Sequence, residues 1–205
     1  MSKFYESYWQ NIHGHLDDFK TKWSKLKKFI PQESGITILD FGCGAGQILK
    51  EIQKINPRAK LIGLDVSEKA LGEAKKELPG AEFYGINDGE KVPVSDNSVD
   101  FIFSSEVIEH IYDTENAVSE VNRILKPGGK LLLTTPYHGF IKNLIILLSG
   151  KFDSHFNPTG PHVRFFSKRT LSNLLKKFGF KIEKLGYYGR FYPIPHSIFT
   201  LAVKR

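Results

Sequence analysis

A cluster of glycines occupies positions 42–46, directly after a short apolar, β-branched run and directly before apolar residues at helical spacing. Glycine lets a backbone turn tightly and approach a ligand without a Cβ in the way. A helix that follows such a turn presents its first N–H groups and the positive end of its dipole. The cluster therefore predicts a site for an anionic or nucleotide-containing ligand at the first strand–helix turn.

Two carboxylates define this ligand further. The glycine spacing over 42–46 is G-x-G-x-G, and Gln47 stands where the dinucleotide fingerprint requires glycine. Asp40 precedes the loop, and a carboxylate there suits an ammonium or sulfonium group better than a pyrophosphate. Asp65 ends the second apolar run, where a carboxylate can accept hydrogen bonds from both hydroxyls of a ribose. Together these features predict an adenosine-containing ligand.

Near-continuous apolar runs, typical of strands, alternate five times with segments of helical periodicity. We expect strands at 36–41, 61–65, 81–84, 99–104 and 130–135, with helices among them at 48–55, 67–76 and 117–125. Strands that are apolar on both faces are buried parallel strands, so the pattern predicts an α/β protein with a doubly wound sheet. A helix at 167–178 and an antiparallel strand pair at 180–185 and 197–203 are expected to complete the chain.

The segment Ile38-Leu-Asp-Phe-Gly-Cys-Gly-Ala-Gly46 resembles motif I of the class I S-adenosylmethionine (SAM)-dependent methyltransferases, D-x-G-C-G-x-G after a hydrophobic pair. Further segments follow the family pattern in order at 63–67, 83–89, 92–100, 105–111 and 125–129. The subfamily resembled is typified by ubiquinone and menaquinone biosynthetic enzymes and by enzymes that modify glycans, lipids and small molecules. The resemblance implies a Rossmann-like sheet of seven strands in the order 3-2-1-4-5-7-6, with strand seven antiparallel and helices on both faces.

The resemblance also assigns roles in binding SAM, which becomes S-adenosyl-L-homocysteine (SAH) on methyl transfer. Asp40 and the first two glycines would frame its amino-acid end, Asp65 would hold the ribose, and Asp88 with the Gly89 N–H would hold the adenine. Ser105 and Glu106 would line the sulfonium side. The complete predicted cofactor-binding set is Asp40, Gly42, Cys43, Gly44, Gly46, Asp65, Val66, Asp88, Gly89, Ser105 and Glu106.

Methyl transfer from a sulfonium needs chiefly alignment of the acceptor and exclusion of water. A hydroxyl acceptor also needs a general base, whereas a carbon acceptor can do without one. The candidate catalytic residues are His162, His110 and His138, with His155 nearby in the sequence; each has the alternative role of a loop histidine with purely structural contacts. His162 is the first choice as base or substrate ligand, because Gly160–Ser167 resembles a stretch found in glycan- and lipid-linked relatives.

The rest of the chain is expected to cover the acceptor. Residues 1–34 read as an N-terminal helical cap with an amphipathic, lysine-rich second half, and 35–205 as the methyltransferase domain. Within that domain, 137–167 reads as a substrate-side lid whose apolar part, 140–148, is either a core helix or a cover over a greasy substrate. Lysines near it favour a lipid-linked or otherwise amphipathic acceptor, and a peripheral membrane contact is consistent with them.

Composition excludes several other classes. The 205 residues suit one domain, and the single cysteine, Cys43, excludes a disulfide framework or a multi-cysteine metal cage. No metal site is expected, since His13 and His15 form a pair without a third ligand nearby in the sequence. The net charge of +7 is attributed to solvated helix faces, and no nucleic-acid partner is expected. Without an apolar targeting run at the N-terminus, a cytoplasmic protein is expected.

We therefore expect a SAM-dependent methyltransferase (EC 2.1.1.-) that methylates oxygen or carbon of a small-molecule, glycan or lipid-linked acceptor. Three alternatives were weighed. A non-catalytic SAM-binding regulator or scaffold would share the cofactor half. An NAD(P)-dependent oxidoreductase is disfavoured by Gln47, and a nucleic-acid methyltransferase by Ser104-Ser-Glu-Val in place of an N-P-P-Y-type motif. The acceptor and the oligomeric state stay open.

Overall fold

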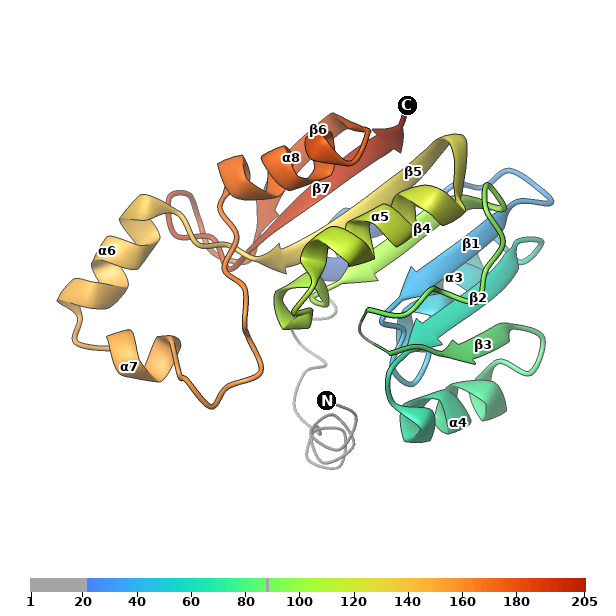
Figure 1. Cartoon of the computed structure of the whole chain (residues 1–205), viewed down its shortest axis with the longest axis horizontal. Coiled ribbons are helices and arrows are strands. Elements are labelled where there is room, and N and C mark those ends of the chain that lie inside the picture. The colour runs from blue at the N-terminus through green and yellow to red at the C-terminus, as the bar shows by residue number, and fades with distance from the viewer. Residues whose placement is uncertain (1–21, 88) are drawn as a thin grey trace.

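The computed structural model describes residues 22–87 and 89–205. Its centre is a sheet in the order β3-β2-β1-β4-β5-β7-β6, in which β7 runs antiparallel to both of its neighbours (Figure 1). The predicted strand order and the antiparallel seventh strand are thereby confirmed. The strands are β1 (Thr37–Phe41), β2 (Lys60–Asp65), β3 (Glu82–Gly85), β4 (Val99–Ser105), β5 (Leu125–Pro136), β6 (Phe180–Tyr188) and β7 (Ser197–Lys204).

Helices cover both faces of this sheet, as predicted. The α-helices are α3 (Gln47–Ile55), α4 (Glu68–Glu77), α5 (Thr114–Ile124), α6 (Phe140–Leu148), α7 (Phe152–His155) and α8 (Lys168–Lys177), with 3-10 turns η1 (Lys27–Phe29) and η2 (Ile108–His110). Ser67 and Ser167 cap α4 and α8, as their position before an apolar periodic run predicts. In Figure 1, α5 and α8 lie over one face of the sheet, and α3 lies behind it.

Alternation of side chains along the strands produces two hydrophobic cores, because successive residues of a strand point to opposite faces. Leu39 and Ile102 belong to the core that also holds buried residues of α5 and α8. Ile38 and Phe101, one position earlier, belong to the core that also holds buried residues of α3 and α4. This double burial explains why the parallel strands read as continuous apolar runs.

The described end of the N-terminal segment packs on the second core. Residues 22–26 are helical and run into η1, with Leu26 fully buried. Trp23 stacks edge-on against Phe103 at a centroid distance of 6.3 Å, and Phe29 packs against Phe199 at 5.6 Å. The predicted amphipathic helix is therefore present from residue 22, and residues 1–21 of the predicted cap lie outside the described residues.

The structure differs from the predicted elements at three places. β5 begins at Leu125 rather than 130, because Leu125 already pairs with Val99 of β4; the Pro-Gly-Gly segment lies in the register shift before pairing resumes at Lys130. β6 extends to Tyr188 because it pairs with β7 along its whole length. The predicted loop after residue 150 contains the short helix α7.

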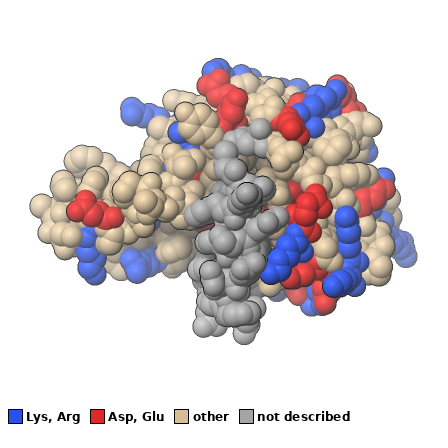
Figure 2. Space-filling model, turned by 60° about the horizontal axis from the view of Figure 1, so that its bottom comes forward, with Lys and Arg blue, Asp and Glu red and all other residues tan. Residues whose placement is uncertain are grey.

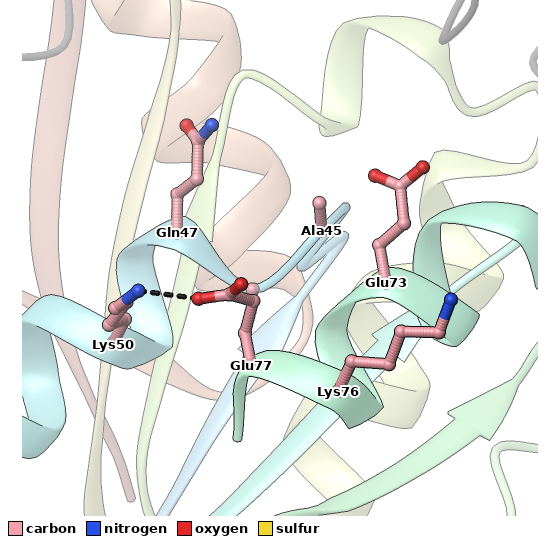
Figure 3. Close-up of a pocket in the computed structure, with 7 residues that line it drawn as sticks. Ala45, Gln47, Lys50, Glu73, Lys76 and Glu77 are labelled. Atoms are coloured by element: carbon pink, nitrogen blue, oxygen red, sulfur yellow. Dashed lines mark hydrogen bonds and ion pairs between the residues drawn. The ribbon is translucent and has the colours of Figure 1, made fainter. Parts of the chain in front are cut away.

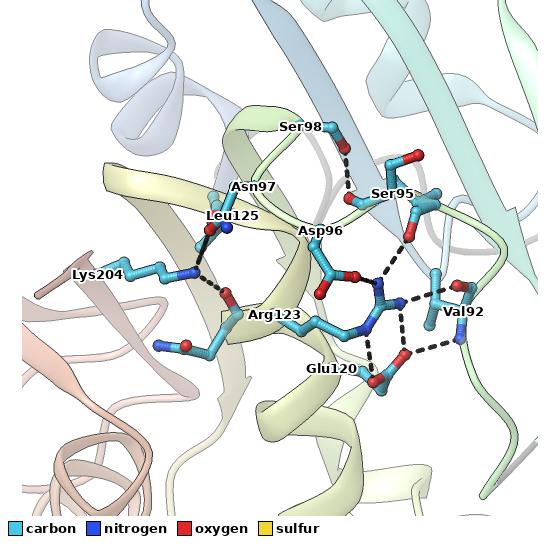
Figure 4. Close-up of polar contacts among 11 residues, drawn as sticks. Val92, Ser95, Asp96, Asn97, Ser98, Glu120, Arg123, Leu125 and Lys204 are labelled. Atoms are coloured by element: carbon cyan, nitrogen blue, oxygen red, sulfur yellow. Dashed lines mark hydrogen bonds and ion pairs between the residues drawn. The ribbon is translucent and has the colours of Figure 1, made fainter.

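Arg123 on α5 fastens the segment between β3 and β4 to the body of the domain. Its guanidinium donates to the carbonyl oxygens of Val92 and Val94 at 2.9 Å each, and it pairs with Asp96 and Glu120 (Figure 4). Glu120 in turn accepts the Val92 N–H at 2.8 Å. The planar fork of arginine suits these divergent acceptors, and a lysine could reach fewer of them.

We expect Arg123→Met to lower the free energy of unfolding by about 2–3 kcal/mol, because several acceptors lose a charged donor together. Urea unfolding followed by circular dichroism measures this change. Lys177→Met is the control: it breaks the exposed Lys177–Glu115 pair and should leave the midpoint nearly unchanged. Equal midpoints for the two variants would contradict the assigned role.

Candidate functional site

The predicted glycine loop leaves β1 in a conformation that requires glycine. Gly42, Gly44 and Gly46 have φ angles of +82°, +52° and +80°, a region that other residues rarely adopt. At Gly42 a Cβ would also come within 2.3 Å of the Val107 side chain. The loop is anchored to β2 because the N–H groups of Gly42 and Cys43 both donate to the Leu64 carbonyl. The glycine cluster thus forms the tight strand–helix turn that the sequence predicts.

Asp65 holds this loop in place. One of its carboxylate oxygens accepts the Gly44 N–H at 2.8 Å, and the other accepts the Ser67 N–H at 2.9 Å. The buried carboxylate therefore joins the glycine loop to the start of α4, a role that sequence reasoning missed because the contact with Gly44 spans the α3 crossover. Ribose binding by Asp65 stays a prediction. It is compatible with these two hydrogen bonds, because each carboxylate oxygen keeps a second lone pair that can accept a ribose hydroxyl.

Asp40 is the unsatisfied group of the site. Its side chain is 1% exposed, and neither carboxylate oxygen has a hydrogen-bond partner in the described part of the chain. Burial, and next the nearby Asp65, raise the pKa of Asp40 to about 8, while Lys22 opposes the shift. A buried carboxyl without partners beside a glycine loop fits a ligand that brings a cationic or hydrogen-bonding group to it.

The other predicted cofactor residues surround this centre or lie outside the description. Cys43 is buried against Gly63, and burial raises the pKa of its thiol, so it stays neutral and unreactive. Val66 is half-buried between Asp65 and the cap of α4. Gly89 has a φ of +82° and open space where a Cβ would stand, whereas Asp88 lies outside the described residues.

Glu106 joins the carboxyl ends of β4, β5 and β6 to the start of β7. It follows β4 with a φ of +56°, a strained angle for a residue with a side chain. Its carboxylate accepts hydrogen bonds from Thr134 on β5 at 2.7 Å, Tyr188 on β6 at 2.7 Å and Ser197 on β7 at 3.3 Å. Ser105, predicted beside it, lies 3.2 Å from the Thr134 hydroxyl. These contacts place Glu106 among the strand ends next to the glycine loop.

Two of the three candidate catalytic histidines meet in space. The rings of His110 and His162 lie 4.8 Å apart in an edge-to-face arrangement, and Nδ1 of His110 is 3.0 Å from the Pro161 carbonyl. The loop is tied down because the N–H groups of Val163 and Arg164 donate to the Glu109 carbonyl. Partial loss of hydration around the rings lowers the pKa of both imidazoles, which favours their neutral forms.

His138, the third candidate, lies in a separate aromatic cluster. Its ring contacts His155, Phe156 and Phe165 at centroid distances of 4.8–5.5 Å. Burial, and next the charge of Lys142, lower the pKa of His138 to about 4. A base so weak is poorly matched to proton transfer at neutral pH.

The apolar segment 140–148 forms α6, and the structure excludes the core alternative for it. No residue of α6 is buried, and Phe140 and Leu148 are 81% and 77% exposed. Figure 1 shows α6 and α7 standing away from the sheet, and Figure 2 shows few charges on this projection. The large hydrophobic side chains exposed in the described residues all follow carboxyl strand ends on the glycine-loop side; they are Tyr112, Phe140, Ile141, Leu144, Ile145, Leu147, Leu148, Phe152, Val163, Phe165, Phe191 and Tyr192.

A hollow on the surface is distinct from this site. Figure 3 shows it between the exposed sides of α3 and α4, where Lys50 and Glu77 form an ion pair. Its lining residues are Ala45, Gly46, Gln47, Lys50, Glu73, Lys76 and Glu77. Neither buried carboxylate of the glycine loop nor any histidine contributes to it, so we do not assign the ligand to this hollow.

The sheet order and the glycine loop with its two carboxylates define the Rossmann-like fold of class I methyltransferases. The profile of a family described as "Methyltransferase domain" matches residues 9–185. A Mycolicibacterium smegmatis protein named "Probable S-adenosylmethionine-dependent methyltransferase" is 34% identical over 150 residues, which are 73% of this chain and 54% of that protein. The demethylmenaquinone methyltransferase of Chlorobaculum parvum is 28% identical over 77% of this chain and 70% of its own.

Solved structures agree on the fold. A SAM-dependent methyltransferase from Mesorhizobium loti superposes with a TM-score of 0.73 over 90% of this chain and 98% of its own, at 19% sequence identity. The chain therefore belongs to the SAM-dependent methyltransferase domain family, so the predicted family is confirmed, and SAM is the cofactor of that family.

The comparisons do not confirm the ubiquinone-like subfamily. The chain spans about half the length of the M. smegmatis relative and less of the two curated relatives that follow it. None of the described helices combines the length and the apolar character needed to cross a membrane.

We expect Asp40→Asn to stabilise the ligand-free protein increasingly as pH rises from about 4 to 8. The folded chain binds the Asp40 proton more tightly than the unfolded chain does, because the pKa is about 8 against an ordinary 3.8. Raising the pH through this window therefore removes stability from the wild type, on the order of 5 kcal/mol by pH 8, and the amide cannot lose a proton. Urea unfolding of both proteins at pH 5 and pH 8 measures the difference, and a pH-independent difference would contradict the buried protonated carboxyl.

Proposed function

We propose that this chain transfers a methyl group from SAM to a hydroxyl oxygen of an amphipathic small molecule, lipid-linked or glycan-linked. The observation that carries this proposal is the coincidence of three features at one edge of the sheet. The glycine loop, the His110–His162 pair and the exposed large hydrophobic side chains of the described chain all lie at the carboxyl strand ends. An acceptor held there would meet polar groups at its reactive end and apolar side chains along its body.

The residues around the glycine loop fit the cofactor. The partnerless carboxyl of Asp40 would receive the ammonium group of SAM, and Asp65 would accept the ribose hydroxyls beside its two backbone bonds. Gly89, with Asp88 before it, would contact the adenine. When bound, SAM supplies a methyl group on a positively charged sulfur, which is already activated for displacement. The protein's own contribution is alignment, water exclusion and removal of the acceptor's proton.

His162 is the residue that we assign to that proton. It is exposed and neutral, and it lies beside the His110 ring, whose Nδ1 the Pro161 carbonyl orients. An exposed neutral imidazole can accept the hydroxyl proton as the C–O bond forms. His110 supports its position, and His138 lines the neighbouring aromatic wall rather than acting as the base.

The segment 137–167 would serve as the substrate-side lid, and residues 1–34 as a cap over the same pocket. Within the lid, one side of α6 exposes large apolar side chains, a surface that fits an acyl or prenyl chain or the interfacial layer of a bilayer. We therefore also propose a peripheral membrane contact through α6. The C. parvum demethylmenaquinone methyltransferase supports including quinone precursors among the acceptors to be screened.

SAH should bind the wild-type chain with micromolar affinity, and Asp40→Asn should weaken it by about 10- to 100-fold through loss of a charge-assisted hydrogen bond to the ammonium. Isothermal titration calorimetry measures both. Asp65→Ala should abolish binding, because it removes both the ribose acceptor and the anchor of the glycine loop. Glu73→Gln, in the separate hollow, is the control and should bind like the wild type. A folded, ligand-free wild type that does not bind SAH would overturn the proposed function.

The double variant Ile145→Glu/Leu148→Glu should reduce sedimentation of the protein with phosphatidylglycerol-containing vesicles by at least fivefold. Both side chains are exposed, so the unfolding midpoint should not fall. The matched control is Lys50→Gln/Lys76→Gln, which changes the net charge equally at the far hollow and should retain most of the binding. If this control loses binding as strongly as the α6 variant, general electrostatic attraction accounts for it and α6 does not.

A further inference from the structure

Three potential metal ligands converge beside the proposed acceptor pocket. Glu109, His110 and His162 each offer one ligand atom, and these atoms lie within 4.8 Å of one another. Two imidazoles and one carboxylate are a donor set that Zn²⁺ and neighbouring divalent transition metals prefer. We propose that these three side chains form a binding site for a divalent cation of this borderline class, with Zn²⁺ as its best match.

Glu109 is the buried anchor of the site. Its side chain is 1% exposed; Oε2 accepts the Thr135 hydroxyl at 2.9 Å, and Oε1 has no hydrogen-bond partner in the described residues. Oε1 lies 3.9 Å from Nε2 of His110. A buried carboxylate oxygen without a partner is costly, and a cation is one of the few groups that offsets the cost.

His110 has the surroundings of a metal ligand. Its Nδ1 lies 3.0 Å from the Pro161 carbonyl, which accepts the proton there and leaves the lone pair of the ring on Nε2. Ligating histidines characteristically donate their other N–H to a carbonyl or carboxylate, because this fixes the tautomer and the ring orientation. The Thr135 hydroxyl fixes the Glu109 carboxylate in the same way.

His162 closes the set from the loop side. Its neighbours Val163 and Arg164 are hydrogen-bonded to the Glu109 carbonyl, so the loop is attached to the anchor residue itself. Ligand atoms in a tetrahedral zinc site lie about 3.4 Å apart, given bond lengths of about 2.1 Å. Because the His162 imidazole is exposed, a small rotation of its side chain can bring its ligand atom closer to those of Glu109 and His110.

Three protein ligands leave one position open, and in a tetrahedral site that position takes water or a substrate oxygen. A bound cation lowers the pKa of a hydroxyl that it contacts, and would then replace His162 as the group that activates the acceptor. This last role rests on the proposed function, whereas cation binding itself does not.

The test is titration of the untagged, metal-stripped full chain with Co²⁺, followed by visible absorption, and then displacement by Zn²⁺. We expect one equivalent to bind with a micromolar or lower Kd and with the intense bands of four-coordinate Co²⁺. Glu109→Gln and His162→Ala should each raise the Kd at least tenfold. His162→Ala is the decisive variant because its side chain is exposed and the fold should survive, as circular dichroism can check.

Matched controls separate this site from other histidines of the chain. His155→Gln removes a histidine outside the cluster, and His13→Gln/His15→Gln removes the closely spaced pair; both should retain the wild-type Kd. No stoichiometric binding, or binding lost in the 13/15 variant and kept in His162→Ala, overturns the site. SAH calorimetry on the same samples tests the proposed function separately, since SAH binding without Co²⁺ binding refutes only the metal site.

Discussion

Two carboxylates, Asp40 and Asp65, are buried side by side at the carboxyl ends of β1 and β2, and the glycine loop lies over them. Asp65 is satisfied by backbone N–H groups, one of them from the loop, so it holds Gly44 in its left-handed conformation. Asp40 has no such partner and bears the cost of burial. The fold thus buries a carboxyl group whose oxygens its own residues do not satisfy, at a cost in stability that binding sites commonly carry.

The position of the acceptor side depends on the same edge of the sheet. β4 pairs with β1 in the sheet and ends just before Glu106. The Glu106 carboxylate accepts hydrogen bonds from side chains of β5, β6 and β7 and so holds these strands together. The antiparallel β7 is needed here, because it brings Ser197 at its start to the edge where the parallel strands end. Beyond Glu106, η2 presents Glu109 and His110 to the loop that contains His162. The proposed cofactor side and the proposed acceptor side are therefore held by one continuous set of strand ends.

The apolar side chains at this edge contrast with the well-packed cores. Leu26, Leu49 and Leu171 are fully buried on the two faces of the sheet, whereas no residue of α6 is fully buried. The exposed side chains of α6 are all apolar, whereas its half-buried residues include Lys142 and Asn143, and Lys142 ties the helix to the body of the domain by donating to the His196 carbonyl. This combination is consistent with a lid whose apolar surface is completed by an acceptor or a membrane.

The order of the strands, the bounds of α6, the caps of α4 and α8 and the glycine loop were predictable from the sequence, because periodicity, turn chemistry and motif spacing are local properties or a family pattern. The sequence predicted a turn at the Pro-Gly-Gly segment, whereas the structure has a register shift there within the β4–β5 pair. Such a shift leaves no local signal in the sequence. Only the tertiary structure decided that Asp40 lacks partners while Asp65 has them, and that α6 is exposed rather than buried. It also brought His162 next to His110 and the orphaned oxygen of Glu109, which lie about 50 residues earlier in the chain. Whether a side chain is buried, and whether its polar atoms find hydrogen-bond partners, depends on residues that are distant in the sequence. These residues become neighbours only once the sheet has formed.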